Sequence, residues 1–143
     1  MDWGQILFSF TGRINRAKYW LAALFYFVAL LVLVAVAFAA GISAGIGTMM
    51  VILVLIYIPF LISSLAVAVK RLHDRNKSGW WLLLFYLVPA ILDGLGKQID
   101  APAATILLSL ASLAIAVWAF VELGCLRGTA GPNQYGPDPL GFT

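Results

Sequence analysis

The sequence is poor in charged side chains. Asp, Glu, Lys and Arg make up only 10% of the 143 residues, whereas hydrophobic residues make up 63%. Soluble domains carry about 25% charged and roughly 45–50% apolar residues. A chain of this size could not hide so much apolar surface from water, because small domains leave much of their surface exposed. The composition therefore excludes a soluble enzyme, a disordered chain and a secreted disulfide scaffold, and it indicates an integral membrane protein.

Cysteine and histidine are each present once, as Cys125 and His73. A single cysteine can form neither an intrachain disulfide nor a cysteine-based metal cluster. A single histidine excludes a histidine-rich zinc site and bis-histidine haem ligation within one chain. We therefore expect no metal site and no cofactor.

Four apolar segments are candidates for membrane helices, since about 20 residues cross the hydrocarbon core of a bilayer. They cover residues 19–40, 48–69, 80–95 and 103–126. Pro59 and Pro89 are expected to kink the second and the third. The tail over residues 127–143 is rich in glycine and proline and is expected to form turns. We expect one all-α membrane domain over residues 1–143, folded as a four-helix transmembrane bundle.

Residues 2–10 form a separate segment before the first span. Trp3, Ile6, Leu7 and Phe10 recur at helical spacing and would lie on one helix face. An amphipathic segment of this kind lies in the membrane interface with its aromatic side chains at the acyl boundary. We expect a short interfacial helix here.

Basic residues are distributed unevenly among the connections. Eight of the nine Lys and Arg residues precede the first span, lie between the second and third, or follow the fourth; only Lys97 lies elsewhere. Because basic flanks stay on the cytoplasmic side, we expect both termini and the 70–79 loop in the cytoplasm. The net charge of +3 thus indicates basic helix flanks, and we expect no nucleic-acid partner.

Three polar motifs flank the spans. They are Phe10-x-Gly12-Arg13-Ile14-x-Arg16-x-x-Tyr19-Trp20, Lys70-Arg71-Leu72-His73-Asp74-x-x-x-Ser78-Gly79-Trp80-Trp81 and Gly128-Thr129-x-Gly131-x-Asn133-x-x-Gly136-x-Asp138-Pro139. In this order they resemble the small bacterial inner-membrane proteins catalogued as "domain of unknown function 805". That family more often has Arg where Lys70 stands and Phe where Tyr19 stands. The resemblance implies a four-helix protein of the bacterial inner (plasma) membrane, and it implies no activity.

The motifs gather most of the polar side chains at one membrane face, and two interpretations of them stay open. They form a structural cluster that ties the helix ends together, or they bind an anionic lipid headgroup or phosphate, which Arg can hold in a bidentate way. The candidate residues are Arg13, Arg16, Lys70, Arg71, His73, Asp74, Arg75, Ser78, Gly128, Thr129, Gly131, Asn133 and Asp138.

Glu122 is an ionisable residue within the fourth span, about one turn from its end. A charge inside a span is a hypothesis for a functional site, whereas the structural alternative pairs it with Arg127, Arg71 or Lys18. The neighbours His73 and Asp74 invite comparison with a catalytic pair, but no nucleophile accompanies them. We therefore expect no catalytic residue.

Taken together, these features favour a non-enzymatic inner-membrane protein that acts by contact at its basic cytoplasmic face. Membrane lipids with anionic headgroups are the expected partners, and a membrane protein or a second copy of the chain is a further candidate. The alternative is a small oligomeric transporter or channel that uses Glu122 and the proline-kinked helices.

Overall fold

The computed structural model describes residues 3–141, and every regular element in that range is helical. The elements are α1 (Trp3–Phe8), α2 (Arg16–Ala44), α3 (Ile46–Asp74), η1 (Leu83–Leu87), α4 (Val88–Gly96), α5 (Pro102–Phe120) and η2 (Val121–Cys125). η1 and η2 are π-helical, so their hydrogen bonds span five residues. A short helix, α1, is found within the segment 2–10. Residue 2 and the last two residues of the predicted tail lie outside the described range.

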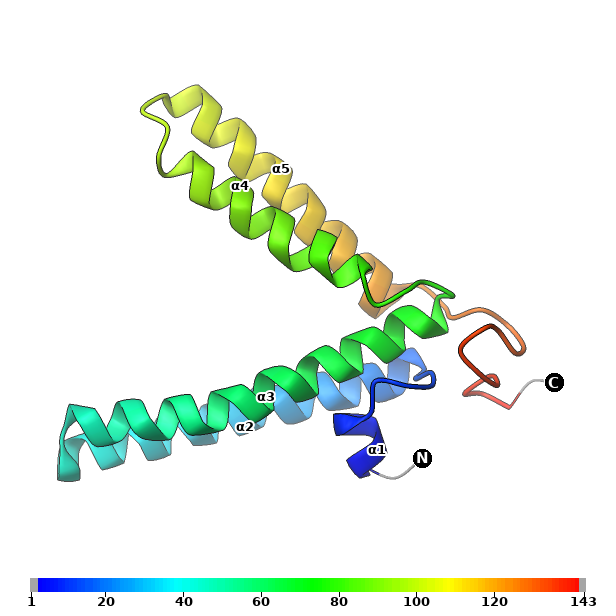
Figure 1. Cartoon of the computed structure of the whole chain (residues 1–143), viewed down its shortest axis with the longest axis horizontal. Coiled ribbons are helices and arrows are strands. Elements are labelled where there is room, and N and C mark those ends of the chain that lie inside the picture. The colour runs from blue at the N-terminus through cyan, green and yellow to red at the C-terminus, as the bar shows by residue number, and fades with distance from the viewer. Residues whose placement is uncertain (1–2, 142–143) are drawn as a thin grey trace.

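Figure 1 shows two helical hairpins that share one end and diverge from it. One hairpin is α2 with α3, and the other is η1 and α4 with α5. The hairpins contact each other where η2 packs against α2 and α3, and α1 and the tail lie at this shared end. The four-helix bundle expected from the sequence is not confirmed, since the helices pack as two pairs. Lipid tails are as apolar as the helix faces, so membrane helices gain no hydrophobic free energy by closing against each other.

Within residues 3–141, three helices are long and apolar enough to cross a membrane: α2, α3 and the continuous helix Pro102–Cys125. The fourth apolar helix, Leu83–Gly96, is shorter. α2 and α3 contain 29 residues each. At 1.5 Å per residue each is about 44 Å long, which exceeds a hydrocarbon core of roughly 30 Å. These two helices therefore tilt in the bilayer or extend beyond it.

A single glycine, Gly45, reverses the chain between α2 and α3. The sequence predicted a connection over residues 41–47, but residues 41–44 continue α2, and α3 begins at Ile46. Gly45 has a φ of +88°, a conformation that strains any residue with a side chain. Its N–H donates to the carbonyl of Gly41 over 3.0 Å.

The two prolines have different surroundings. Pro59 lies inside α3, which continues through it. Pro89 has no N–H to offer the carbonyl of Phe85, and it lies at the start of α4, directly after η1. In η1 the N–H of Val88 donates to the carbonyl of Leu83. Because the π turn is wider, the helix continues past Pro89 although this residue has no N–H to donate.

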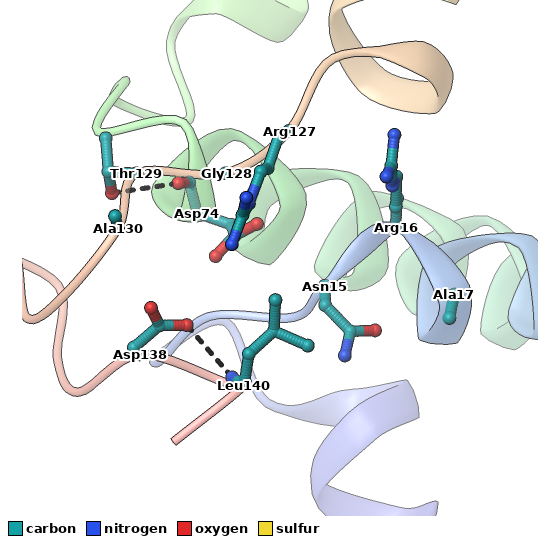
Figure 2. Close-up of a pocket in the computed structure, with 10 residues that line it drawn as sticks. All are labelled: Asn15, Arg16, Ala17, Asp74, Arg127, Gly128, Thr129, Ala130, Asp138 and Leu140. Atoms are coloured by element: carbon teal, nitrogen blue, oxygen red, sulfur yellow. Dashed lines mark hydrogen bonds between the residues drawn. The ribbon is translucent and has the colours of Figure 1, made fainter. Parts of the chain in front are cut away.

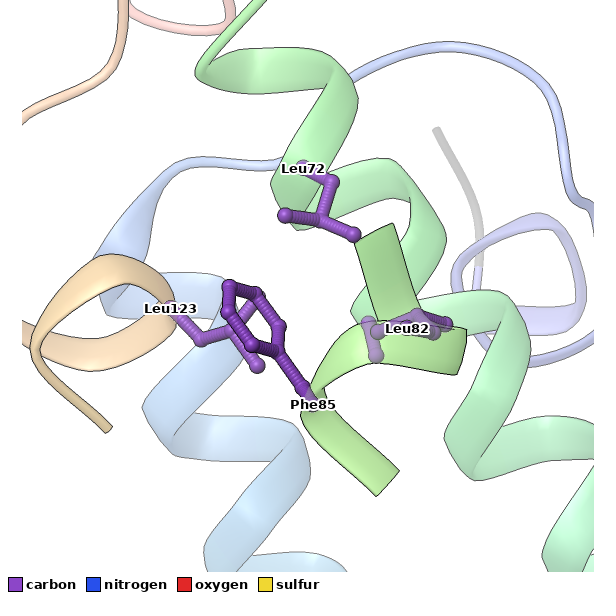
Figure 3. Close-up of a cluster of buried hydrophobic side chains, with 5 residues drawn as sticks. Leu72, Leu82, Phe85 and Leu123 are labelled. Carbon is purple, nitrogen blue, oxygen red and sulfur yellow. The ribbon is translucent and has the colours of Figure 1, made fainter. Parts of the chain in front are cut away.

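The main buried core lies where the hairpins meet. Leu72 of α3, Phe85 of η1 and Leu123 of η2 pack with Ala68 and Leu82, and Figure 3 shows their side chains converging. The apolar side chains of the diverging arms are mostly exposed. The best-packed part of the molecule is therefore the shared end, and this end positions the candidate site.

The distribution of basic residues generates a topological prediction. In a Cys125→Ser background, we expect Gln134→Cys to be labelled from the cytoplasm and Gln98→Cys from the opposite side, because both native side chains are exposed and only the tail adjoins the basic motifs. The measurement is labelling by a membrane-impermeant maleimide in membrane vesicles of both orientations. Labelling of both positions from one side would contradict the four-span topology.

Candidate functional site

The structure brings the three sequence motifs together at the shared end of the hairpins. Side-chain hydrogen bonds join three segments: the connection before α2, the end of α3 with its following loop, and the tail. We call this region the basic end, and it comprises residues 10–16, 70–79 and 122–141. Here the structure agrees with the expectation that the motif residues gather at one face.

Asp74, the last residue of α3, lies at the centre of the basic end. Its Oδ1 accepts hydrogen bonds from Arg13 Nε and Nη2 over 3.2 and 3.1 Å, and its Oδ2 accepts one from Arg71 Nη1 over 2.5 Å. Its backbone oxygen accepts from the N–H and the hydroxyl of Thr129 over 2.8 and 3.1 Å. All three charged side chains are buried, so Asp74 joins the N-terminal connection and the tail to α3.

Arg13 also fixes the course of the tail. Its Nη1 donates to the carbonyl of Gly131 over 2.7 Å and to that of Gly136 over 3.2 Å, and its Nη2 donates to the carbonyl of Thr129 over 2.7 Å. The turns of the tail thus surround one guanidinium. Glycine and proline suit such turns because they adopt the backbone conformations that turns require.

Asp138 stabilises the same turns. Its carboxylate accepts the N–H groups of Leu140 and Gly131, each over 2.9 Å. The hydrogen bond from Leu140, and then that from Gly131, favour the charged form and lower the pKa of the Asp138 carboxyl. This residue therefore orders the tail from within.

The end of η2 is capped by side chains from the other hairpin. Arg71 donates to the carbonyl of Leu123 over 2.7 Å and to that of Leu126. Trp20 Nε1 donates to Gly124 over 3.0 Å, and Arg16 donates to Cys125 over 3.2 Å. The last carbonyls of a helix have no partner within it, and cations near them also interact favourably with the helix dipole. Side chains of α2 and α3 therefore hold the two hairpins together.

Lys70 caps α1 in the same manner. Its Nζ donates to the carbonyls of Gln5 (over 2.6 Å) and Ile6, and the hydroxyl of Ser63 donates to the carbonyl of Leu7 over 2.8 Å. Lys70 is fully buried. α1 is thus attached to α3 by polar contacts at its C-terminal end.

Glu122 has other partners than those the sequence suggested. Its Oε1 accepts from Arg75 Nε over 3.0 Å and from Lys77 Nζ over 3.1 Å, whereas Arg127, Arg71 and Lys18 had been expected. Lys77 Nζ also lies 4.4 Å from the centre of the Trp81 ring, within the range of a cation–π contact. The expected pairing was wrong because the loop after α3 folds back over η2.

His73 and Asp74 do not form a side-chain pair, since both carboxylate oxygens of Asp74 accept from arginines. His73 Nδ1 lies 3.2 Å from the carbonyl of Gly12, and its ring stacks on Tyr135 with centres 3.9 Å apart. The carbonyl of His73 accepts from Asn133 Nδ2 over 2.9 Å. Two residues of the tail, Asn133 and Tyr135, therefore contact His73.

Sequence reasoning missed several contributors, among them Trp20, Lys77 and Tyr135. It also gave no role to Gly124, where a Cβ would lie 2.8 Å from the Trp20 ring. Trp20 belongs to the first motif but was given no role, and nothing local in the sequence distinguishes Lys77 and Tyr135 from ordinary flanking cations and interfacial aromatics. The backbone oxygen of Ser78 accepts the N–H of Trp81. Within residues 3–141, no three His, Cys, Asp or Glu residues form a group that could hold a metal ion.

A pocket of about 390 Å³ opens beside this network. It is lined by Asn15, Arg16, Ala17, Asp74, Arg127, Gly128, Thr129, Ala130, Asp138 and Leu140. Figure 2 shows that the start of α2, the end of α3 and the tail all contribute to it. Arg16 and Arg127 are exposed, whereas Arg13, Lys70 and Arg71 are buried. The pocket is therefore lined by two exposed arginines, Arg16 and Arg127.

Gly128 generates a stability prediction, because a Cβ there would lie 2.0 Å from Asp74 Oδ2. Gly128→Ala should displace the carboxylate from its arginines, and breaking a buried ion pair costs about 3–5 kcal/mol. We expect a clearly lower unfolding temperature, measured by circular dichroism in detergent.

The control for this change is Gly94→Ala in α4, where an added Cβ would meet no atom within 4 Å. Replacing a helical glycine by alanine where the added Cβ meets no other atom is neutral or stabilising by up to about 1 kcal/mol. Equal loss of stability in the two variants would contradict the role assigned to Gly128.

Comparison with known proteins identifies relatives over almost the whole chain. The family described as "Protein of unknown function (DUF805)" matches residues 7–137. The Escherichia coli K12 protein "Uncharacterized protein YiiR" is 34% identical over 94% of this chain and 88% of its own length. "Inner membrane protein YhaH" is 32% identical over 97% of both chains, and "Inner membrane protein YhaI" is 29% identical over 92% of this chain and 86% of its own length. No solved structure matches.

These relatives agree with the three sequence motifs, with the convergence of the motifs at one end and with the apolar helices. The chain belongs to the DUF805 family and is an inner membrane protein.

Proposed function

We propose that this protein is non-enzymatic and binds the phosphate of an anionic lipid headgroup at its basic end, on the cytoplasmic side of the inner membrane. The binding site is the pocket between the first turn of α2 and the tail. Anionic lipids of the cytoplasmic leaflet attract basic segments close to the membrane. The asymmetric distribution of Lys and Arg supports this orientation.

The observation that carries the proposal is that the buried and the exposed cations of the basic end have different partners. Arg13, Lys70 and Arg71 are buried and donate to groups of the chain itself. Arg16 is exposed at the pocket and directs one hydrogen bond to Cys125, although a guanidinium carries five N–H donors. Arg16 thus has capacity for a phosphate oxygen, and Arg127 lines the same pocket.

The acidic residues of the pocket do not oppose an anion strongly. The Asp74 carboxylate already contacts two guanidinium groups. The Asp138 carboxylate accepts two backbone N–H groups, and these hydrogen bonds offset part of its charge. Arg16 and Arg127 are the exposed cations that line this pocket.

A transport function would assign a different role to Glu122. An intramembrane carboxylate that relays ions or protons needs a continuous polar path. Here Glu122 is paired with Arg75 and Lys77 at the basic end, so its charge is already compensated within the chain. This geometry favours binding over transport.

The test compares two short-chain lipids with identical acyl chains, phosphatidylglycerol and phosphatidylcholine. Each is titrated calorimetrically into the detergent-solubilised full chain. We expect preference for phosphatidylglycerol, and we expect Arg16→Gln to weaken its binding by about tenfold or more, because a hydrogen bond to a charged group contributes about 1.5–3 kcal/mol.

Lys97→Gln is the matched control, since Lys97 is exposed in the connection between α4 and α5. It should leave the preference unchanged. Equal affinity for the two lipids, or the same loss of affinity in Lys97→Gln as in Arg16→Gln, would contradict headgroup binding at this pocket.

A further inference from the structure

An apolar groove runs along α3 on the inner side of the hairpin junction. It consists of two adjoining cavities of about 410 and 480 Å³, which share Leu65, Leu82 and Leu83 as lining residues. Cavities of roughly 300–1,000 Å³ are typical of small-molecule sites. The groove shares no lining residue with the pocket that contains Arg16 and Arg127.

Two helices form the walls of the groove. On α3 the wall residues recur every four positions, as Leu61, Leu65, Val69 and His73, which places them on one face of the helix. The opposite wall is formed by residues of the helix that contains η1: Leu82, Leu83, Tyr86, Leu87 and Ala90. Leu82 is buried and also belongs to the core between the hairpins, so the groove borders this core.

The length of the groove matches one leaflet of a bilayer. From Leu61 to His73 the helix rises about 18 Å at 1.5 Å per residue. One leaflet contributes about half of the roughly 30 Å hydrocarbon core. A chain that followed the groove would therefore run from the interface to near the middle of the bilayer.

The polarity of the groove changes along its length. At the basic end it is bordered by Phe10, His73, Ser78, Trp80 and Tyr135, which are side chains of the kind found at headgroup level. Towards its far end six of the eight lining side chains are aliphatic, and the other two are Ser64 and Tyr86. No Asp, Glu, Lys or Arg lines either cavity. The complementary ligand has an elongated hydrocarbon body and a polar end.

We propose that this groove holds one acyl chain of a phospholipid from the leaflet that contains the basic end. The groove's length along α3 and its change from polar to mostly aliphatic lining match a single hydrocarbon chain with a polar end. The acyl-chain site does not rest on the headgroup pocket proposed above.

The experiment uses the full chain in vesicles of phosphatidylethanolamine and phosphatidylglycerol that contain a trace of phosphatidylethanolamine with a diazirine on its acyl chain. After irradiation, digestion and mass spectrometry, we expect labels concentrated on the two walls of the groove. Native mass spectrometry after gentle detergent extraction should show one phospholipid retained per chain. Even labelling of all exposed apolar side chains would overturn the proposal.

Leu65→Trp and Leu83→Trp fill the groove from opposite walls and should each remove most of the retained lipid. Leu107→Trp is the control, because Leu107 is 67% exposed on α5 and lies outside the groove. Retention of lipid in both groove variants, or a native mass of a dimer without lipid, would refute acyl-chain binding. Preference for phosphatidylglycerol over phosphatidylcholine should survive in Leu83→Trp, which separates this site from the headgroup pocket.

Discussion

The buried carboxylate of Asp74 constrains everything else at the basic end. Removing a carboxylate from water costs several kcal/mol, and the cost is offset only when its partners are well placed. Here Arg13 and Arg71 each contact a different oxygen of that carboxylate. Both arginines are buried as well, so their remaining N–H groups need acceptors of their own. They find these in the carbonyls of the tail and of η2, and one buried charge thereby fixes four segments of the chain.

Backbone carbonyls are the common acceptors in this network, and the membrane setting gives the physical reason. Water cannot solvate a helix end that is buried in an apolar environment, so the protein must supply the donors itself. Lys70 does this for α1, and Arg71 with Trp20 does it for η2. Because each donor comes from a different element than its acceptor, satisfying a helix end also joins two elements. The same hydrogen bonds therefore cap the helix ends and hold the elements together.

Much of this architecture follows from local features of the sequence. The apolar runs predicted the helical segments, and Asn15, which precedes α2, accepts the N–H of Lys18 as a helix cap does. The convergence of the motifs was also predicted. The partners of Glu122 and the divergence of the hairpins were not, because both depend on how distant segments approach each other. Lipid-exposed helices also lack a polar face that would indicate which side meets a neighbour.

The division between a polar network at one end and apolar arms beyond it has a consequence for function. The network is internally satisfied: within the described residues, no buried side-chain nitrogen or oxygen lacks a hydrogen-bond partner. Buried polar networks of this kind are rigid because each missing bond would leave a desolvated group unpaired. The diverging arms have no such constraint, since exposed apolar side chains in a bilayer are covered by lipid. A fixed end therefore orients two hairpins whose apolar side chains are mostly exposed, and this arrangement is the basis of the lipid binding that we propose.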